Sequence, residues 1–473
     1  MNDDVDVIVV GAGPTGLPLA CELALGGVRC RLLERRADRP NITRAFAVHA
    51  RTLELLDARG LADELIAGGV PVHEVSPTPG TTLDLSRIDS RYPMVLVAPQ
   101  SRTELLLEKR AAELGVEIVR GARLTGLHVD DGGVRAERED GTVDSAAYLV
   151  GCDGAHSTVR GLLGVDFVGE QYATHILLAD VRLTAPPDVA MFATASPAGA
   201  VIVVPFGDGW FRAIAWDRLR EQVPLDVPLP MAEMRDAFTR IAGTDFGMDE
   251  QRWSSRFLSE RRQARRYQVG RAFLAGDAAH VHSPMGAQGM NTGIGDAMNL
   301  GWKLAATVNG GAPQALLESY QTERHRVGRQ VLALTDAFNH LVLGRSAWQR
   351  AAQARLVRLL VGLRPTREYL AGRLTGLGIA YPPHGRGHHR WVGRRAPDLA
   401  CIEGRLYELL REGRFVLVGA DAPGRPRVRT ARRAGPVGHR EPAAVLVRPD
   451  GYVAWAHDDV PAEQEVAEAL PLY

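Results

Sequence analysis

The chain has 473 residues, and its 56 basic and 56 acidic side chains leave no net charge at pH 7. This length suffices for roughly two or three domains, and the charge balance gives no general attraction to nucleic acid or to an anionic membrane. Its four cysteines show no Cys-x-x-Cys pair and no spacing of metal ligands. The composition therefore predicts no metal site and favours a reducing, cytoplasmic compartment.

The N-terminal apolar run, residues 5–25, is not expected to be a signal peptide. Acidic residues precede it, and glycine and proline interrupt it. Because no stretch of about 18 apolar residues occurs elsewhere, no membrane span is predicted.

The first predicted element is a buried strand that runs into a glycine-rich turn. Asp6–Val10 leads to Gly-x-Gly-x-x-Gly and then to a helix predicted over 15–26. This pattern is typical of dinucleotide binding: the diphosphate lies at the N-terminal end of the helix, and an acidic residue after the next strand binds the ribose. The predicted cofactor residues of this segment are Gly11, Gly13, Pro14, Thr15, Gly16, Glu34 and Arg35.

Further elements alternate along the chain. After a Pro/Ser/Thr-rich stretch at 71–99, a helix is predicted over 103–114 and a strand over 117–119, followed by an antiparallel meander over 123–149. The patterns then predict strands over 177–183, 201–205 and 210–216, and helices over 291–309 and most of 314–375. Near the C-terminus they predict a helix over 405–411, a strand over 415–418 and a hairpin around 449–451.

Two later segments complement the glycine-rich turn. Residues 148–160 form a predicted strand, turn and short helix with Asp153 and Arg160, and Asp153 fits either a helix cap or a polar groove. The segments 273–280 and 284–291 fit the ribityl chain and ring of a flavin. One cofactor that spans all of these segments would be FAD.

These motifs resemble those of the single-component, class A FAD-dependent aromatic hydroxylases, which have the para-hydroxybenzoate hydroxylase fold. The resemblance covers essentially the whole chain and is closest to polyketide hydroxylases of the rifampicin monooxygenase type. It implies an α/β fold with a Rossmann-like FAD-binding domain, an inserted and mostly antiparallel substrate domain, and a C-terminal thioredoxin-like domain that lacks redox cysteines. The expected boundaries are 1–75, 98–178 and 265–335 for the first domain, 76–97 and 179–264 for the second, 336–385 for a helical linker, and 386–473 for the third.

The resemblance also implies roles for individual residues. Arg44 and Gln100 would contact the diphosphate or adenosine, Asp153 would belong to the cofactor site, and Asp277 would bind a ribityl hydroxyl. A loop over the isoalloxazine would contain Pro284, Gly286, Gly289, Met290 and Asn291, with backbone N–H groups facing the edge that gains negative charge.

The implied reaction is hydroxylation of a bulky aromatic or polyketide substrate by O₂ through a flavin C4a-hydroperoxide. NADPH or NADH would bind only transiently, since the sequence holds a single dinucleotide motif. The enzyme would be a monomer or homodimer with no nucleic-acid or membrane partner.

Four residues are candidates for substrate contact. Trp210, Arg212 and Trp216 alternate along one strand and would place aromatic walls and a cation on one face. Met285 departs from the Phe or Thr of many relatives and lies beside the expected flavin. His49, His280 and His282 are interpreted as packing or structural histidines.

The sequence also bears on three other functions. A flavin-dependent halogenase needs a suitably placed lysine and a Trp-x-Trp segment, but the chain has only Lys109 and Lys303 and no Trp-x-Trp. A flavin-loaded protein that binds a ligand without turnover remains an alternative. Nucleic-acid binding by the arginine clusters at 386–395 and 425–440 is disfavoured, because both resemble solvated loops.

Overall fold

The glycine-rich turn lies in the middle of an eight-stranded sheet. The computed structural model describes residues 5–38, 45–78, 81–310, 312–343, 347–383, 389–422, 425, 427–438, 441–462 and 464–466. Strands follow the order β17-β18-β11-β1-β2-β8, and β9 and β10 extend the sheet from β11. Their bounds are β1 Val5–Val10, β2 Cys30–Glu34, β8 Glu117–Arg120, β9 Leu124–Val129, β10 Val134–Arg138, β11 Val143–Gly151, β17 Gln268–Val269 and β18 Ala272–Leu274.

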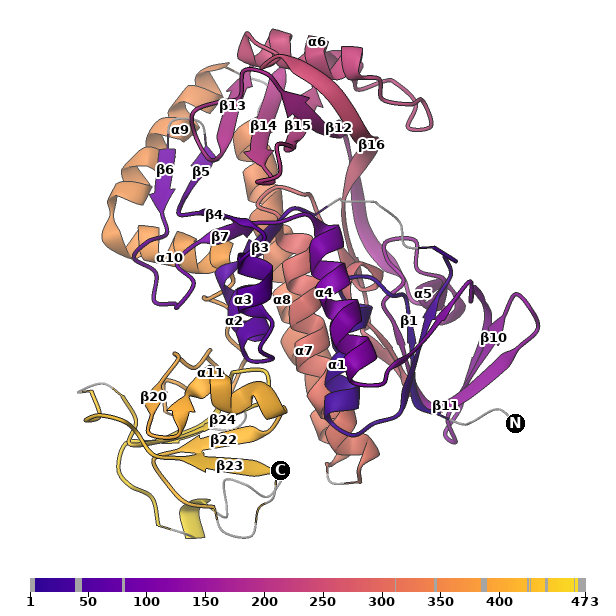
Figure 1. Cartoon of the computed structure of the whole chain (residues 1–473), viewed down its shortest axis with the longest axis vertical. Coiled ribbons are helices and arrows are strands. Elements are labelled where there is room, and N and C mark those ends of the chain that lie inside the picture. The colour runs from indigo at the N-terminus through magenta and orange to yellow at the C-terminus, as the bar shows by residue number, and fades with distance from the viewer. Residues whose placement is uncertain are drawn as a thin grey trace.

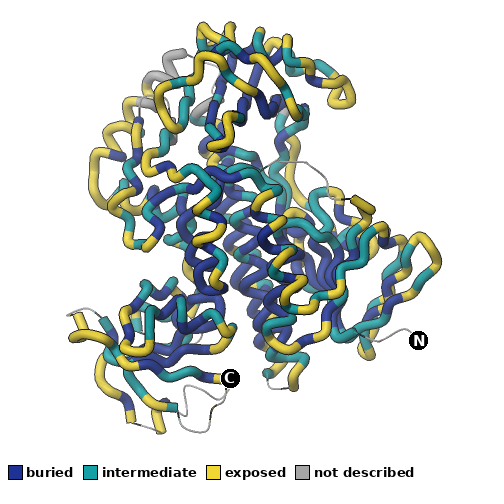
Figure 2. Tube along the Cα trace, in the orientation of Figure 1, coloured by how far each residue is buried: buried dark blue, intermediate teal, exposed yellow. Residues whose placement is uncertain are grey.

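Parallel pairing of β1 with both β2 and β11 explains why β1 is continuously apolar, since both faces of such a strand are buried. Helix α1 (Gly16–Leu25) packs against α4 (Gln100–Glu113) and α7 (Gln288–Val308). The short helix α5 (Thr158–Leu162) follows β11. The main core of the molecule lies between this sheet and these helices (Figure 2).

A six-stranded sheet lies at the other end of the molecule (Figure 1). Its order is β13-β14-β15-β12-β16-β19, and its described pairings are antiparallel. Helix α6 (Met231–Ala242) covers one face, where it forms a separate core with β12, β14 and β15. The strands are β12 Phe167–Leu183, β13 Phe192–Ser196, β14 Gly199–Pro205, β15 Phe211–Asp217, β16 Met248–Ala264 and β19 His280–Val281.

Smaller elements lie between the two large sheets. A three-stranded sheet has the order β3-β7-β4, and β5 pairs with β6. Long helices then run along the molecule and wrap around its upper part (Figure 1). These elements are β3 Ala47–His49, β4 Val70–Val72, β5 Glu74–Thr78, β6 Thr81–Asp84, β7 Val95–Val97, α2 Ala50–Asp57, α3 Ala62–Ile66, α8 Gln314–Leu343, α9 Ala347–Gly362 and α10 Arg364–Thr375.

The C-terminal domain contains a four-stranded mixed sheet of order β23-β22-β24-β25, in which β22 and β23 are parallel. This domain lies beside α2, and partly buried ion pairs join the two: Arg395 bonds Glu54 at 2.9 Å, and Arg405 bonds Asp57 at 3.0 Å. Its elements are β20 Ala400–Cys401, β21 Gly404–Arg405, α11 Leu406–Leu409, β22 Phe415–Val418, β23 Val428–Ala431, β24 Ala444–Val447 and β25 Val453–His457.

The structure confirms the predicted fold class. The helix predicted over 15–26 is α1, the meander over 123–149 is β9, β10 and β11, and the hairpin around 449–451 is formed by β24 and β25. Strand β12 begins at Phe167, well before the predicted start at 177, and α6 and β16 were not predicted. Within the described part of the chain, no helix has both the length and the apolarity needed to cross a membrane.

Candidate functional site

Three glycines of the first turn have different surroundings. A Cβ atom at Gly11 would lie 2.5 Å from the carbonyl oxygen of Cys152, and one at Gly16 would lie 1.9 Å from the carbonyl oxygen of Gly11. A Cβ at Gly13 would meet no atom within 4 Å. Gly11 and Gly16 are therefore required by packing, whereas Gly13 borders open space at the start of α1, where a diphosphate would lie.

The carboxylate of Glu34 closes this turn at the end of β2. Its oxygens accept hydrogen bonds from the backbone N–H groups of Ala12 at 2.9 Å and Arg36 at 3.0 Å. Arg35 beside it is exposed. These bonds fix the carboxylate next to the glycine turn, the position of a ribose-binding acid.

The resemblance implies two further residues for the diphosphate or adenosine, Gln100 and Arg44. Gln100 accepts a hydrogen bond from the Ala45 N–H at 3.0 Å and donates to Glu104 at 2.8 Å, so its side chain holds the chain after residue 44. Arg44 lies outside the described residues.

The N-terminal turn and the segment around Asp277 meet in space. Cβ atoms at Gly276 and at Gly293 would each lie 2.3 Å from Oγ1 of Thr15, so both glycines allow this close approach. The two segments, far apart in the sequence, thus form one continuous surface. Pro14 and Thr15 belong to the glycine-rich turn, and Thr15 makes this contact.

A fully buried acid, Asp296, supports this junction. It accepts hydrogen bonds from the Gly276 N–H at 3.0 Å and from Arg324 at 2.6 Å, and it contacts Nε2 of His280 at 2.7 Å. Burial alone would raise the pKa of Asp296, but Arg324 and His280 outweigh burial and hold this pKa below its usual value. No motif predicts this role, because Asp296 lies on α7 outside the recognised segments.

Asp153 caps α5. Its carboxylate accepts from the hydroxyl of Ser157 at 2.5 Å and from the Val159 N–H at 3.1 Å. These bonds give Asp153 a structural role at the start of α5, and its place in the cofactor site stays a prediction.

The loop before α7 has an unusual backbone. Gly286 and Ala287 both have left-handed conformations, with φ of 76° and 51°, and Ala287 is one of two described residues other than glycine with positive φ. Such strain in an ordered loop is typical of binding sites. The following helix, α7, points its first free N–H groups toward this loop, where they would stabilise negative charge on a bound flavin.

Asn291 and Met290 hold this loop from within. The Asn291 side chain accepts from the His49 N–H at 2.9 Å and donates to the carbonyl oxygens of Ala47 at 3.0 Å and Ala287 at 2.8 Å. Met290 is buried in the main core. Both side chains therefore face protein, and any contact with a flavin would come from their backbone.

A space beside Gly289 tests whether the site fits FAD. A Cβ at Gly289 would lie 3.9 Å from Nε2 of His282 and 4.0 Å from Oδ1 of Asp277. That nitrogen of His282 is buried without a described hydrogen-bond partner, while Nδ1 lies 3.0 Å from the Ser283 carbonyl. Asp277 is the exposed residue in the buried run 272–280. The unpartnered nitrogen of His282, the carboxylate of Asp277 and the space left by Gly289 together suit a polyhydroxyl chain such as ribityl.

An apolar cavity of about 160 Å³ adjoins the loop 284–287. Trp216 and Met285, both predicted substrate residues, lie in its wall. The described lining comes from ten stretches of the chain and consists of Phe46, Ala47, His49, Val72, Val75, Ser76, Leu85, Val95, Val97, Met191, Ala193, Thr194, Ala200, Val201, Ile202, Val204, Ile214, Trp216, Pro284, Met285, Gly286, Ala287, Phe338 and Leu374.

Trp210 and Arg212 lie outside this wall. Arg212 shares a strand face with Ile214 and Trp216, but it is fully buried and its Nε donates to Asp180 at 2.7 Å. Its guanidinium lies 5.9 Å from the ring of Phe46, which does line the apolar cavity. Arg212 therefore lies behind Phe46 and does not itself line the apolar cavity.

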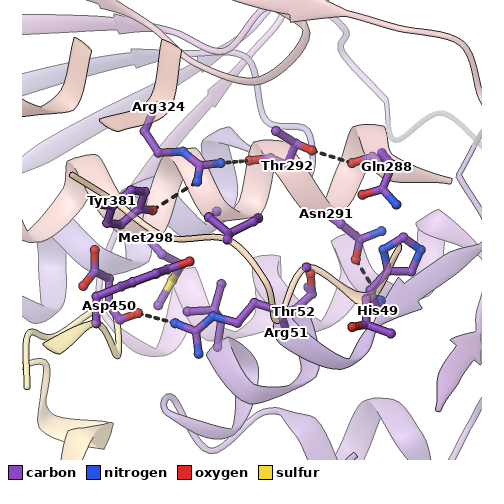
Figure 3. A pocket seen from close by; sticks show the side chains of 16 residues that line it. His49, Arg51, Thr52, Gln288, Asn291, Thr292, Met298, Arg324, Tyr381 and Asp450 are labelled. Carbon is purple, nitrogen blue, oxygen red and sulfur yellow. Dashed lines mark hydrogen bonds between the residues drawn. The ribbon is translucent and has the colours of Figure 1, made fainter. Parts of the chain in front are cut away.

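A second, inner cavity of about 30 Å³ lies between α2, α7, α8 and the C-terminal domain (Figure 3). Arg324 donates to the Thr292 carbonyl and to the Tyr381 hydroxyl, and Arg51 donates to the Asp450 carbonyl at 2.6 Å (Figure 3). The volume suffices for one or two water molecules. His49 borders both this inner cavity and the apolar cavity.

The fold and the site define a flavoprotein that binds FAD beside an apolar cavity. Residues 4–335 match the family model described as FAD binding domain, and residues 389–471 match the model described as aromatic-ring hydroxylase, C-terminal. The chain belongs to this family of FAD-dependent aromatic-ring hydroxylases.

Named relatives cover nearly the whole chain. A rifampicin monooxygenase of Streptomyces venezuelae is 41% identical over 99% of this chain and 98% of its own length. The structure of an anhydrotetracycline hydroxylase from Streptomyces rimosus superposes with a TM-score of 0.88 at 38% identity, covering 99% of each chain. A dialkyldecalin synthase of Streptomyces rugosporus is 37% identical over 95% of each chain.

Proposed function

We propose that this monooxygenase hydroxylates a bulky aromatic compound of the polyketide type that carries no carboxylate, using NAD(P)H and O₂. The apolar cavity beside the loop 284–287 is the observation that carries the proposal. Its described lining contains no carboxylate, guanidinium or ammonium group, so a small carboxylated phenol would find no countercharge there. The names of the relatives, which include rifampicin and tetracycline-type monooxygenases, support a large polycyclic substrate.

The chain's own residues would hold the cofactor and exclude water. Gly13 and the start of α1 would receive the diphosphate, Glu34 the ribose, and Asp277 with His282 the ribityl chain. FAD, once reduced by the nicotinamide, supplies the electrons that activate O₂ for transfer of one oxygen atom to the aromatic ring. The apolar walls around Trp216 and Met285 would keep water from the reacting atoms.

A nicotinamide cofactor would bind only transiently while it reduces the flavin. The described fold holds one glycine-rich dinucleotide turn, and the resemblance to the family implies a flavin that moves to meet NAD(P)H. A cytoplasmic enzyme, with access to this reductant and with its four cysteines free and buried, fits this scheme.

Anaerobic reduction of the bound FAD by NADPH tests the proposal, with rifampicin and anhydrotetracycline as probes. Acceleration of flavin bleaching by one of them, followed by incorporation of one atom from isotopically labelled O₂, is expected. Trp216→Ala should weaken the acceleration, whereas Trp210→Ala, outside the wall, should keep it. Purification without flavin, or oxidation of NADPH that no aromatic compound affects, would contradict the proposal.

A second candidate is ring formation without oxidation. The dialkyldecalin synthase among the relatives favours it, because that chain matches this one along 95% of its length. An apolar cavity that holds its ligand in one folded conformation would suit such a reaction. Conversion of a substrate without consumption of NADPH or O₂ would identify this activity.

A further inference from the structure

Helix α9 exposes a stripe of leucines on the outside of the molecule. Leu356, Leu359, Leu360 and Leu363 follow the spacing i, i+3, i+4 and i+7, which places them along one side of the helix and its end. All four side chains are exposed, and Leu359 is the most exposed of them at 68%. Tyr369, on the following helix α10, is exposed as well. Exposed apolar side chains that gather on one face mark an interaction surface.

Another side of α9 packs on residues that line the apolar cavity. Figure 1 shows α9 at the outer edge of the molecule, beside β5 and β6. Val357 and Val361 of α9 belong to one apolar cluster with four residues of the cavity wall, which are Val75, Leu85, Val95 and Leu374. Helix α9 is therefore the layer between the leucine stripe and this part of the cavity.

Positive charge accompanies the leucine stripe. Arg355, Arg358 and Arg364 are exposed, and residues 355–369 contain four arginines but a single acid, Glu368. Glu368 is already paired with Arg364 at 2.7 Å. The zero net charge of the whole chain, which predicts no membrane partner, conceals this local excess of positive charge.

We propose that the leucine stripe and its arginines bind the surface of a lipid bilayer that contains anionic lipids. The leucines would enter the interface, the arginines would lie near the lipid phosphates, and Tyr369 would lie at the level of the headgroups. A second copy of this chain fits less well, because contact between two such stripes brings like charges together. The place of the stripe over the cavity favours a bilayer over an acidic protein, since compounds that fill an apolar cavity also partition into lipid.

This surface has a consequence for the supply of substrate. Binding through α9 would hold the cavity wall next to the bilayer, where an apolar polycyclic compound is more concentrated than in water. That consequence rests on the proposed function. Binding of α9 to a bilayer does not depend on it and is measured without substrate.

Co-sedimentation of the full, FAD-loaded chain with lipid vesicles tests the inference, in the absence of substrate and NADPH. One set of vesicles contains equal parts of phosphatidylglycerol and phosphatidylcholine, and the other contains phosphatidylcholine alone. The double variant Leu356→Gln, Leu359→Gln changes two stripe residues that are 54% and 68% exposed. The matched control is Leu105→Gln, Leu219→Gln, which changes two leucines outside α9 that are 54% and 70% exposed.

The wild type and the control should bind the mixed vesicles at least tenfold more tightly than phosphatidylcholine alone. The stripe variant should bind the mixed vesicles at least tenfold more weakly than the wild type. Its FAD content and thermal unfolding should match those of the wild type, because the substituted side chains are exposed.

Several results would overturn the inference. One is a wild type that binds neither vesicle, and another is equal loss of binding in the stripe variant and the control. Equal binding of the wild type to both vesicles would remove the role of anionic lipid. A wild-type dimer that the stripe variant dissociates would assign the stripe to a second copy of the chain. Binding of polyglutamate but of neither vesicle would assign it to an acidic protein. Each of these results leaves the proposed function intact.

Discussion

Gly13 and Gly16 belong to one turn, yet the same substitution should affect them differently. A methyl group at Gly13 would meet open space, while one at Gly16 would lie 1.9 Å from a backbone oxygen. We expect Gly13→Ala to fold normally but to bind FAD at least tenfold more weakly, because the methyl group occupies the path of the diphosphate. Gly16→Ala should reduce thermal stability as well as FAD binding.

The comparison is made by FAD titration and by thermal unfolding of both variants with and without FAD. If Gly13→Ala retained wild-type affinity for FAD, the diphosphate would not lie over this turn. Equal loss of stability in both variants would show that the space over Gly13 is not free.

His282 should make folding stability depend on pH. Burial lowers its pKa from 6.5 to about 4 in the folded protein, as it does for His49. Between these values the unfolded chain binds a proton that the folded chain does not, so stability is retained near pH 7 and falls as the pH falls toward 4. Between pH 7 and pH 5, each of these histidines should lower the free energy of unfolding by about 2 kcal/mol.

Substitution His282→Leu should therefore reduce the loss of unfolding free energy between pH 7 and pH 5 by about 2 kcal/mol. Urea unfolding at a fixed excess of FAD measures the difference. His156→Leu, at an exposed position, is the control and should keep the wild-type dependence on pH. A His282→Leu variant as acid-sensitive as the wild type would mean that His282 does not stay neutral in the folded state.

At the level of elements, the start of α7 depends on one side chain. Asn291 makes three hydrogen bonds to backbone groups, two in β3 and one in the flavin loop. Asn291→Ala should free the loop and weaken FAD binding about tenfold, because the N–H groups at the helix start lose their fixed direction. Thr307→Ala removes a hydrogen bond near the other end of α7 and should leave FAD affinity unchanged. Equal FAD affinity of Asn291→Ala and the wild type would contradict this positioning role.

The sequence predicted best those elements whose pattern is strictly local. The glycine turn and α1, the meander β9–β11 and the hairpin β24–β25 all follow from strand alternation and turn residues. Helix α6 also carried local signals, since Pro230 precedes it and Gly243 ends it with φ of 80°, but the strands around it obscured them.

Long strands were harder to predict. Strand β16 is rich in arginine and mostly half-buried, so it lacks the apolar alternation of a typical strand. Its pairing with β12 shifts register between Gln171 and His175 and again near Val181, which interrupts the period of two. Such irregular pairing is determined by the partner strand and cannot be read from one segment.

In the candidate site too, residues within local motifs were predictable and residues brought together by the fold were not. Motif residues such as Gly13, Glu34 and Asp277 follow from spacing, and the structure places them along one surface. The wall of the apolar cavity cannot be predicted from sequence spacing, because residues such as Val95, Phe338 and Leu374 come from separate elements. His49 was interpreted as a packing or capping residue, since a single histidine gives no sign of the cavity that it borders.

At the scale of the whole molecule, the C-terminal domain is joined to the FAD-binding part by buried charges. Arg448 follows β24 and bonds Glu323 of α8 at 2.8 and 3.0 Å, and Glu323 also bonds Lys303 at 2.8 Å. All three side chains are buried. Asp450 and Tyr452 of the same domain also close the inner cavity, so docking of this domain completes the surroundings of His49.

Arg448→Met should uncouple the two parts of the chain. Removing one partner of a buried ion pair leaves the other uncompensated and typically costs about 3–5 kcal/mol. We expect one calorimetric unfolding transition for the wild type and two for Arg448→Met, with the C-terminal domain released first and cleaved by protease as a separate fragment. Arg429→Met is the control: Arg429 pairs with Glu412 at the surface of the same domain and should contribute less than about 1 kcal/mol. A single, unshifted transition in Arg448→Met would mean that apolar contacts alone hold the domain in place, and the inner cavity would then stay closed without this charge cluster.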